Sequence, residues 1–246
     1  MTILAGKTVL LTGALGSLGR AQAVTLAKAG AKTFLLDRPD HEHAASFAKT
    51  LPGAVFIGQD LSDLPASQKR VEDLIGAEGP IDILINNAAL IINKPFEEFS
   101  LDEYEEQMRV NSASAFALVR AVAPAMKAKG AGRIINFCSL TLNGGWSGYV
   151  PYVASKGALL GLTKALAREL GAFGITVNAI SPGAVVSEAE ARVFGDQLEA
   201  YNQKMLDHQC LKKRIQPEHV ADLVLFLASP ASDMISGQNI AIDGGW

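Results

Sequence analysis

Residues 8–19 read TVLLTGALGSLG, and this stretch decides the fold. It begins as a short apolar run and continues as a turn with Gly13, Gly16 and Gly19, which leads into a helical pattern. A glycine-rich turn between a strand and a helix lets backbone N–H groups approach a pyrophosphate at the helix N-terminus. The stretch therefore predicts the first strand-helix unit of an α/β fold that binds a dinucleotide.

The same alternation of short apolar runs and longer helical patterns continues to the C-terminus. Most of the runs are apolar without polar alternation, which is typical of parallel strands covered on both faces. Strands are expected at residues 7–12, 32–37, 54–58, 81–86, 133–139, 175–181 and 238–243. Helices are expected at residues 17–29, 41–51, 65–78, 101–129, 151–171 and 217–228. We predict a Rossmann-like doubly wound α/β fold, with a seven-stranded parallel sheet and helices on both faces.

No linker, repeat or low-complexity segment divides the chain. We therefore expect residues 1–246 to form a single dinucleotide-binding and catalytic domain. Residues 184–216 depart from the alternation, because they mix polar and apolar residues with helical periodicity. This segment is expected to be a lid over the substrate.

Composition excludes several classes of protein. The 22 Lys+Arg and 25 Asp+Glu give a net charge of −3, and the basic residues are scattered, so neither nucleic acid nor anionic lipid is an expected partner. No apolar stretch approaches the roughly 18 to 20 residues that cross a bilayer. Cys138 and Cys210 form no CxxC motif, which favours a reducing, cytoplasmic location. His41 and His43 have no third ligand in sequence, so no metal site is expected.

An acidic residue ends the second expected strand. Asp37 lies about 18 residues after Gly19, where its carboxylate can accept hydrogen bonds from a ribose 2′-OH. The same carboxylate would repel a 2′-phosphate, which favours NAD over NADP. Arg38 follows directly and could supply the charge partner that NADP needs, so NADP stays open as the alternative.

A tyrosine and a lysine are spaced to share one face of a helix. Tyr152 is the one tyrosine with a lysine four residues later, Lys156. A free phenol has a pKa of about 10, and a nearby ammonium lowers it by favouring the phenolate. The pair is therefore a candidate general acid/base with its activator.

Together these motifs resemble the short-chain dehydrogenase/reductase family in its compact form, over nearly the whole chain. The resemblance rests on the glycine turn, Asn86-Asn87-Ala88, Asn111, Ser139, Tyr152-x-x-x-Lys156 and Pro182-Gly183, in the order and spacing of the family. It implies that Tyr152 is the general acid/base, that Ser139 positions and polarises the substrate oxygen, and that Lys156 lowers the pKa of Tyr152 and binds ribose. It also implies that Asn111 holds a water molecule in a proton relay.

The resemblance extends to a wall that binds the cofactor. It places Asp60 and Leu61 beside the adenine, Asn87 near the adenine ribose, and the stretch from Pro182 to Ser187 against the nicotinamide carboxamide. The expected cofactor-binding residues are Gly13, Gly16, Ser17, Leu18, Gly19, Asp37, Asp60, Leu61, Asn87, Ala88, Tyr152, Lys156, Pro182, Gly183, Val185 and Ser187.

Two positions depart from the family pattern. Ser17 stands where the family usually has glycine, and Ala89 replaces the last glycine of the Asn-Asn-Ala-Gly turn. We expect the Ser17 hydroxyl to donate to a phosphate of the cofactor. The alternative is weaker cofactor binding, because the backbone would approach the phosphates less closely.

Substrate residues are expected after the fifth strand and in the lid. They are Ser139, Leu140, Asn143, Trp146, Tyr149, Tyr152, Glu188 and Arg192. The aromatic side chains favour a cyclic or aromatic substrate, whereas Asn143, Glu188 and Arg192 favour the hydroxyls of a sugar or polyol, and the sequence leaves both open.

The expected activity is NAD-dependent interconversion of a secondary alcohol and its carbonyl by hydride transfer. The alternatives are an NADP-dependent carbonyl or 3-oxoacyl reductase and a non-catalytic, dinucleotide-sensing scaffold. The resemblance also implies a homotetramer, since family members of this kind are usually tetramers.

Overall fold

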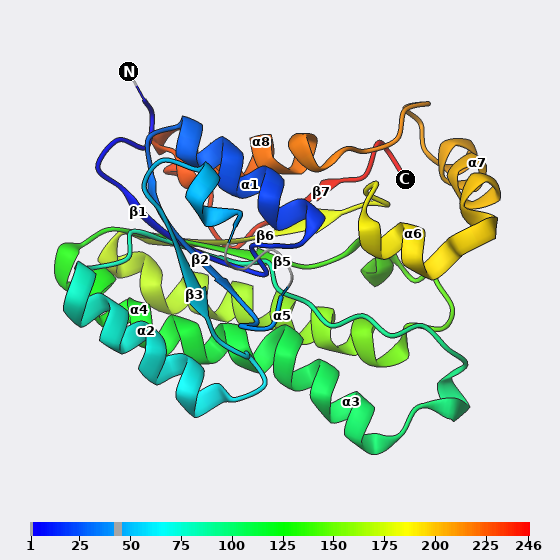
Figure 1. Ribbon diagram of the computed structural model, residues 1–246, viewed down its shortest axis with the longest axis horizontal. Coiled ribbons are helices and arrows are strands. Elements are labelled where there is room, and N and C mark those ends of the chain that lie inside the picture. The colour runs from blue at the N-terminus through cyan, green and yellow to red at the C-terminus, as the bar shows by residue number, and fades with distance from the viewer. Residues whose placement is uncertain (1, 42–45) are drawn as a thin grey trace.

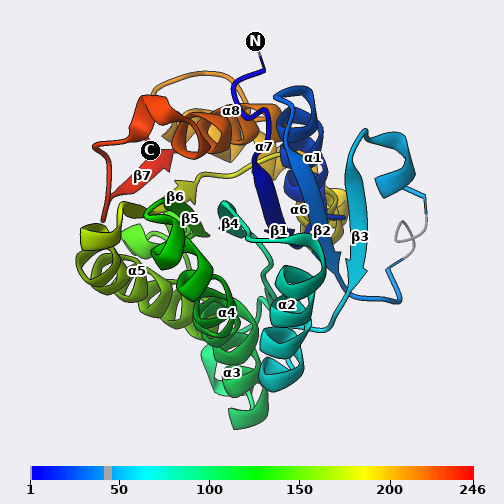
Figure 2. The same ribbon diagram turned by 90° about the vertical axis from the view of Figure 1, so that its left-hand side faces the viewer.

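A seven-stranded parallel sheet forms the centre of the computed structural model, which describes residues 2–41 and 46–246 (Figures 1 and 2). The strand order is β3-β2-β1-β4-β5-β6-β7, and each neighbouring pair is parallel. The strands are β1 (Thr8–Thr12), β2 (Lys32–Asp37), β3 (Ala54–Gly58), β4 (Ile83–Asn86), β5 (Gly132–Phe137), β6 (Ile175–Pro182) and β7 (Asn239–Ile242). Each strand lies where the sequence predicts it, within two residues at either end, which confirms the fold class.

Helices cover both faces of this sheet. They are α1 (Ser17–Lys28), α2 (Leu64–Glu78), α3 (Leu101–Met108), α4 (Ser114–Lys129), α5 (Val150–Leu170), α6 (Glu188–Phe194), α7 (Leu198–His208) and α8 (Pro217–Ala228). Helices α1 and α8 pack together on one face, and α2, α4 and α5 lie on the other (Figure 2). None of the helices in the described part of the chain is both long enough and apolar enough to cross a membrane.

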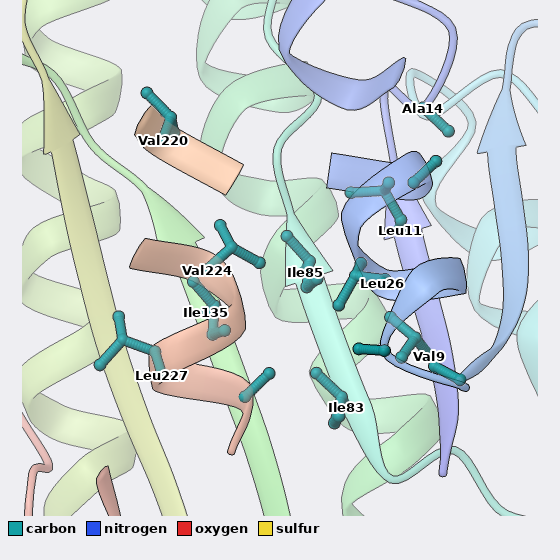
Figure 3. Close-up of a cluster of buried hydrophobic side chains, with 14 of the residues drawn as sticks. Val9, Leu11, Ala14, Leu26, Ile83, Ile85, Ile135, Val220, Val224 and Leu227 are labelled. Atoms are coloured by element: carbon teal, nitrogen blue, oxygen red, sulfur yellow. The ribbon is translucent and has the colours of Figure 1, made fainter. Parts of the chain in front are cut away.

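The period of two along each strand builds two apolar cores. In β1, Val9 and Leu11 face α1 and α8, while Leu10 faces the opposite helices. In β4, Ile83 and Ile85 join the first core, and Leu84 joins the second. Figure 3 shows the first core, in which Leu26 of α1 and Val224 of α8 meet the strand side chains. A strand with apolar residues on both faces must be covered twice, which is why the sheet is doubly wound.

Two of the expected helices differ in the structure. Residues 101–129 are interrupted by a π-helical turn, Arg109–Ala113, between α3 and α4. Of residues 41–51, the described part forms only the short 3-10 turn Ala48–Thr50, so a full helix was a wrong prediction there, and residues 42–45 lie outside the described ranges. One turn suffices because it buries Ala48 and packs Phe47 and Leu51 against the first core.

The strand order reverses between β1 and β4, because the chain runs outward to β3 and then crosses back to β4. In open parallel sheets, ligands bind beyond the carboxyl ends of the strands at this reversal point. Thr12 ends β1 and Asn86 ends β4 there. Residues 184–216, the expected lid, follow β6 at the same end of the sheet and form α6 and α7 (Figure 1).

Candidate active site

Two glycines of the turn after β1 are required by close contacts within the protein. Gly13 has a φ of +61°, and a Cβ there would lie 2.7 Å from the Cα atom of Ala88. A Cβ on Gly19 would lie 2.1 Å from the carbonyl oxygen of Gly13. At Gly16, by contrast, a Cβ would meet only that carbonyl oxygen, at 3.8 Å. The protein's own packing therefore does not need Gly16, although this residue borders a cavity.

A hydrogen-bond network holds this turn against the end of β4. The Thr12 hydroxyl accepts from the backbone N–H groups of Asn87 and Ala88, at 3.0 and 3.1 Å. The Asn87 amide donates to the carbonyl oxygens of Thr12 and Gly13 and accepts from Gln22. Asn87, expected near the ribose, thus also shapes the turn. Sequence reasoning missed Thr12, whose signal is a buried hydroxyl directly before the first glycine.

A cavity of about 650 Å³ runs along the carboxyl ends of the strands. This volume suits a ligand of cofactor size. All but one of the expected cofactor-binding residues line it: Gly13, Gly16, Leu18, Gly19, Asp37, Asp60, Leu61, Asn87, Ala88, Tyr152, Lys156, Pro182, Gly183, Val185 and Ser187. The exception is Ser17. Ala89 also lines the cavity and has no positive φ, so the turn after β4 adopts its shape without a glycine there.

The Asp37 carboxylate is anchored by backbone groups on both sides. Its Oδ2 accepts from the N–H of Leu15 at 2.8 Å, and its Oδ1 accepts from the N–H of Arg38 at 2.8 Å. Arg38 itself pairs with Asp40 at 3.4 Å. The Asp37 carboxylate therefore places a fixed negative charge on the cavity wall at the end of β2. The neighbouring Arg38 guanidinium is already paired with Asp40.

Ser139, Tyr152 and Lys156 border this same cavity. Ser139 follows the end of β5, and its Oγ accepts from the Thr141 N–H at 3.1 Å and from the Thr141 hydroxyl at 3.0 Å. On α5, the Lys156 Nζ donates to the carbonyl oxygen of Phe137 at 2.6 Å and lies 5.5 Å from the centre of the Tyr152 ring. Helix α5 thus brings its tyrosine and lysine against the end of β5.

Burial is the main influence on the pKa values of Tyr152, Lys156 and Cys138. It raises the pKa of Tyr152 to about 12, against a smaller lowering by a hydrogen bond with Ser139. It also lowers the pKa of Lys156 to about 8 and raises that of the neighbouring Cys138 thiol to about 11. The lowering of the Tyr152 pKa that the sequence led us to expect is therefore not found in this state of the protein, because loss of hydration is the largest influence on the phenol.

Asn111 lies in the π-helical turn and does not line the cavity. Its amide donates to the Leu90 carbonyl at 2.9 Å and to the Ser155 hydroxyl at 3.0 Å, and its Oδ1 accepts from the Leu90 N–H at 2.7 Å. Both amide protons are thus donated to protein groups, which leaves one lone pair of Oδ1 for a water molecule. Asn111 joins the loop after β4 to α5.

Helix α6 touches the glycine turn through Ser17. The Ser17 hydroxyl donates to the Glu188 carboxylate at 3.3 Å and accepts from the Glu188 N–H at 3.1 Å. Arg20 pairs with the same carboxylate at 2.5 Å. The hydroxyl that was expected to meet a phosphate is instead bound to Glu188 of α6. The part that Arg20 plays here was not foreseen from the sequence.

The expected substrate residues separate into two groups. Ser139, Tyr152 and Arg192 line the cavity, whereas the others do not: Leu140, Asn143, Trp146, Tyr149 and Glu188. Trp146 stacks on Trp246, with ring centres 5.4 Å apart, and Tyr149 packs edge-on against Tyr152 at 6.2 Å. Within the described ranges, no cluster of three or more His, Cys, Asp or Glu side chains is placed to hold a metal ion.

The cavity has the features that a dinucleotide needs. Gly16 leaves room for a ligand beside the N-terminus of α1, whose free N–H groups favour an anion. Asp37 offers a carboxylate for ribose hydroxyls, and Tyr152 and Lys156 stand on the same cavity wall. These residues fit NAD(H) or NADP(H).

Comparison with known proteins agrees with this geometry. A family model described as enoyl-(acyl carrier protein) reductase matches residues 13–246. The L-xylulose reductase of Bos taurus is 34% identical over 244 residues, covering 99% of this chain and 97% of that protein. The D-xylose 1-dehydrogenase of Caulobacter vibrioides is 34% identical over 247 residues, covering 99% of this chain and 96% of that protein.

A solved structure is similar over its full length. It is assigned as an NAD(P)-dependent gluconate 5-dehydrogenase from Beutenbergia cavernae, with NADP bound at low occupancy. Its TM-score is 0.90 at 36% identity, and the match covers 100% of this chain and 98% of that chain. The chain therefore belongs to the short-chain dehydrogenase/reductase family, as an NAD(P)-dependent oxidoreductase that acts on CH–OH groups.

Proposed function

We propose that this protein interconverts a secondary alcohol of a sugar or polyol and the corresponding carbonyl, with NAD as the cofactor. One observation carries the proposal: Ser139, Tyr152 and Lys156 border the same cavity as the glycine turn and Asp37. When bound, NAD(H) supplies the hydride chemistry. The chain itself binds the substrate oxygen and moves its proton.

Tyr152 acts as the general acid and base. In carbonyl reduction its phenol donates a proton to the substrate oxygen, on which negative charge develops, and in alcohol oxidation its phenolate takes the proton back. The Ser139 hydroxyl donates a second hydrogen bond to the same oxygen. The Lys156 ammonium, 5.5 Å from the Tyr152 ring centre, stabilises the phenolate. Asn111 supports the relay by fixing Ser155 on α5, with one acceptor site left for water.

The substrate class is supported by the relatives and by the cavity. The similar proteins are named for xylulose, xylose and gluconate, which are all polyhydroxylated. Trp146 and Tyr149, the side chains that favoured a cyclic or aromatic alcohol, lie outside the cavity lining. Of the three polar side chains that favoured a sugar or polyol, Arg192 lines the cavity, and Asn143 and Glu188 do not.

The proposal treats residues 1–246 as one catalytic domain with a lid at residues 184–216, assembled as a homotetramer in the cytoplasm. Phe116 on α4 and Val150 on α5 are 49% and 54% exposed, which suits burial between subunits. The two free cysteines, Cys138 and Cys210, suit a reducing compartment.

Turnover with a panel of alcohols tests the function directly. We expect NAD to be reduced with polyols, aldoses or aldonates, and not with cyclic or aromatic alcohols. The measurement is the absorbance of the reduced nicotinamide under matched substrate concentrations. NADPH-dependent reduction of a 3-oxoacyl thioester would replace this proposal by a biosynthetic reductase, and dinucleotide binding without any turnover would indicate a scaffold.

Replacing Asp37 by asparagine tests the choice of cofactor. The variant keeps the shape of the side chain and removes its charge, so we expect the ratio of NADPH to NADH affinity to rise by about 10- to 100-fold, since a 2′-phosphate no longer meets a fixed anion. Fluorescence titration with each reduced dinucleotide measures the ratio. Asp222→Asn is the matched control, because Asp222 is exposed on α8 and lies outside the cavity lining. An unchanged ratio in Asp37→Asn would remove Asp37 as the selector.

A further inference from the structure

We propose that Arg192, on helix α6 of the lid, binds the phosphates of the dinucleotide and not the substrate. The inference rests on the proposed function, because it takes the cavity as a dinucleotide site. Sequence analysis assigned Arg192 to the substrate. The two faces of α6 favour the phosphates instead.

The first face of α6 lies at the N-terminus of α1. Glu188 begins α6, and its carboxylate binds the Ser17 hydroxyl at 3.3 Å and the Arg20 guanidinium at 2.5 Å. Its backbone N–H also donates to Ser17, at 3.1 Å. Ser17 is the first residue of α1, the helix whose N-terminus favours anions. Residue 188 of the lid is therefore fixed directly beside the expected position of the phosphates.

Arg192 shares this face. It follows Glu188 by four residues, so the Cβ atoms of the two side chains lie roughly 5 to 6 Å apart on the helix surface. Arg192 is exposed and lines the cavity together with Gly16 and Leu18 of the glycine turn. No side chain or carbonyl in residues 2–41 and 46–246 pairs with its guanidinium. An unpaired cation thus borders the groove one helical turn from the end of α1.

The opposite face of α6 is directed toward the catalytic tyrosine, and its charge is already neutralised. Glu190 is buried and accepts two hydrogen bonds from Arg214, at 2.6 and 2.8 Å. Burial and the nearby Glu190 carboxylate raise the pKa of Tyr149, whose ring lies 6.2 Å from that of Tyr152. Residues 190 and 192 are about 200° apart around a helix. Arg192 is therefore turned away from the side of α6 that faces Tyr149.

The chemistry of this position suits a pyrophosphate. A guanidinium binds phosphate oxygens through two parallel hydrogen bonds, and it keeps its charge at any pH the protein experiences. The glycine turn supplies backbone N–H groups, and the nearby Arg20 guanidinium is already paired with the Glu188 carboxylate. Arg192 supplies a full positive charge from the lid, and the contacts of Glu188 with Ser17 and Arg20 keep α6 in place.

The test compares Arg192→Gln with the wild-type protein in a fluorescence titration with NADH, followed by competition with ADP-ribose and with adenosine. We expect the variant to bind NADH and ADP-ribose about 10- to 100-fold more weakly, the effect of losing a charged hydrogen bond. Adenosine, which has no phosphate, should compete equally well with both proteins. Arg192→Lys should recover part of the affinity. Lys204→Gln removes a charge from exposed α7 outside the cavity and should leave every value unchanged.

Three results would contradict these expectations in different ways. If Arg192→Gln binds NADH as the wild type does while the KM of an acidic or polyhydroxylated substrate rises, Arg192 is a substrate residue and the inference is wrong. If adenosine binding falls as much as NADH binding, the variant has damaged the part of the cavity that binds adenosine, and the phosphate contact is rejected. If the wild-type protein binds neither NADH nor ADP-ribose, the proposed function itself fails, and the inference fails with it.

Discussion

Tyr152→Phe is expected to lower kcat by about 100- to 10,000-fold, the usual contribution of a positioned general acid/base, with NADH affinity close to that of the wild type. The substitution removes one hydroxyl from a side chain that is 8% exposed, and the ring that packs against Tyr149 is kept. The cavity wall therefore stays intact. Only the group that exchanges a proton with the substrate oxygen is lost.

Single-turnover kinetics in both directions measures this effect, because it separates the chemical step from cofactor release. NADH titration on the same protein checks that the site still forms. Tyr104→Phe is the matched control, since Tyr104 lies on α3, is 40% exposed and does not line the cavity. Turnover of Tyr152→Phe at the wild-type rate would remove Tyr152 from the mechanism, whatever the substrate.

Lys156→Met is expected to reduce turnover strongly and, at the same time, to alter how stability depends on pH. Lys156 is buried, and burial lowers its pKa from 10.5 to about 8. At neutral pH the buried Lys156 ammonium therefore destabilises the folded wild-type protein. A methionine at this position has no charge and causes no such destabilisation. Between pH 8 and pH 10.5 the folded state releases this proton before the unfolded state does, so the contribution of Lys156 to the free energy of unfolding rises with pH.

The free energy of unfolding of the wild type should therefore rise, relative to that of Lys156→Met, by about 2 to 3 kcal/mol between pH 7 and pH 10. Urea denaturation of both proteins at each pH measures the difference. Burial raises the pKa of the Cys138 thiol from 9 to about 11 and that of Tyr152 from 10 to about 12, which lowers the stability of both proteins at high pH. These two losses are common to the wild type and the variant, so they cancel in the difference. Lys164→Met, on an exposed position of α5, should give a difference that does not change with pH. A flat difference for Lys156→Met would mean that the ammonium is hydrated in the folded protein.

The two short glycine contacts illustrate how far sequence reasoning reaches into the site. The spacing of Gly13 and Gly19 in an apolar strand-turn-helix pattern is sufficient to predict the turn, because only glycine tolerates the 2.7 and 2.1 Å approaches that a Cβ would make there. The position of Asp37 at the end of a strand follows equally from a local pattern. The Gly19 contact and the position of Asp37 depend on neighbours within the first strand-helix-strand unit, whereas the Gly13 contact is with Ala88, after β4.

The error at residues 41–51 and the interruption of residues 101–129 have a different origin. Helical periodicity predicts which side chains can be buried on one face of a helix. It does not predict how many of them will find distant elements to pack against. The 3-10 turn at Ala48 already buries that side chain and packs Phe47 and Leu51 against the first core. At Asn111 the backbone widens into a π-helical turn, where the buried amide binds Leu90 and Ser155, residues that are distant in sequence.

The sequence by itself determined the seven-stranded doubly wound sheet, the dinucleotide turn, and the wall of Ser139, Tyr152 and Lys156, because each depends on local periodicity or on motifs with fixed spacing. Only the tertiary structure decided the proton affinities of Tyr152 and Lys156, since burial, which comes from elements distant in sequence, is the largest influence on both groups. It also decided the partners of Ser17 and the two faces of α6. Glu188 reaches Ser17 across 171 residues of chain, and no local pattern records which distant surfaces the folded sheet brings together.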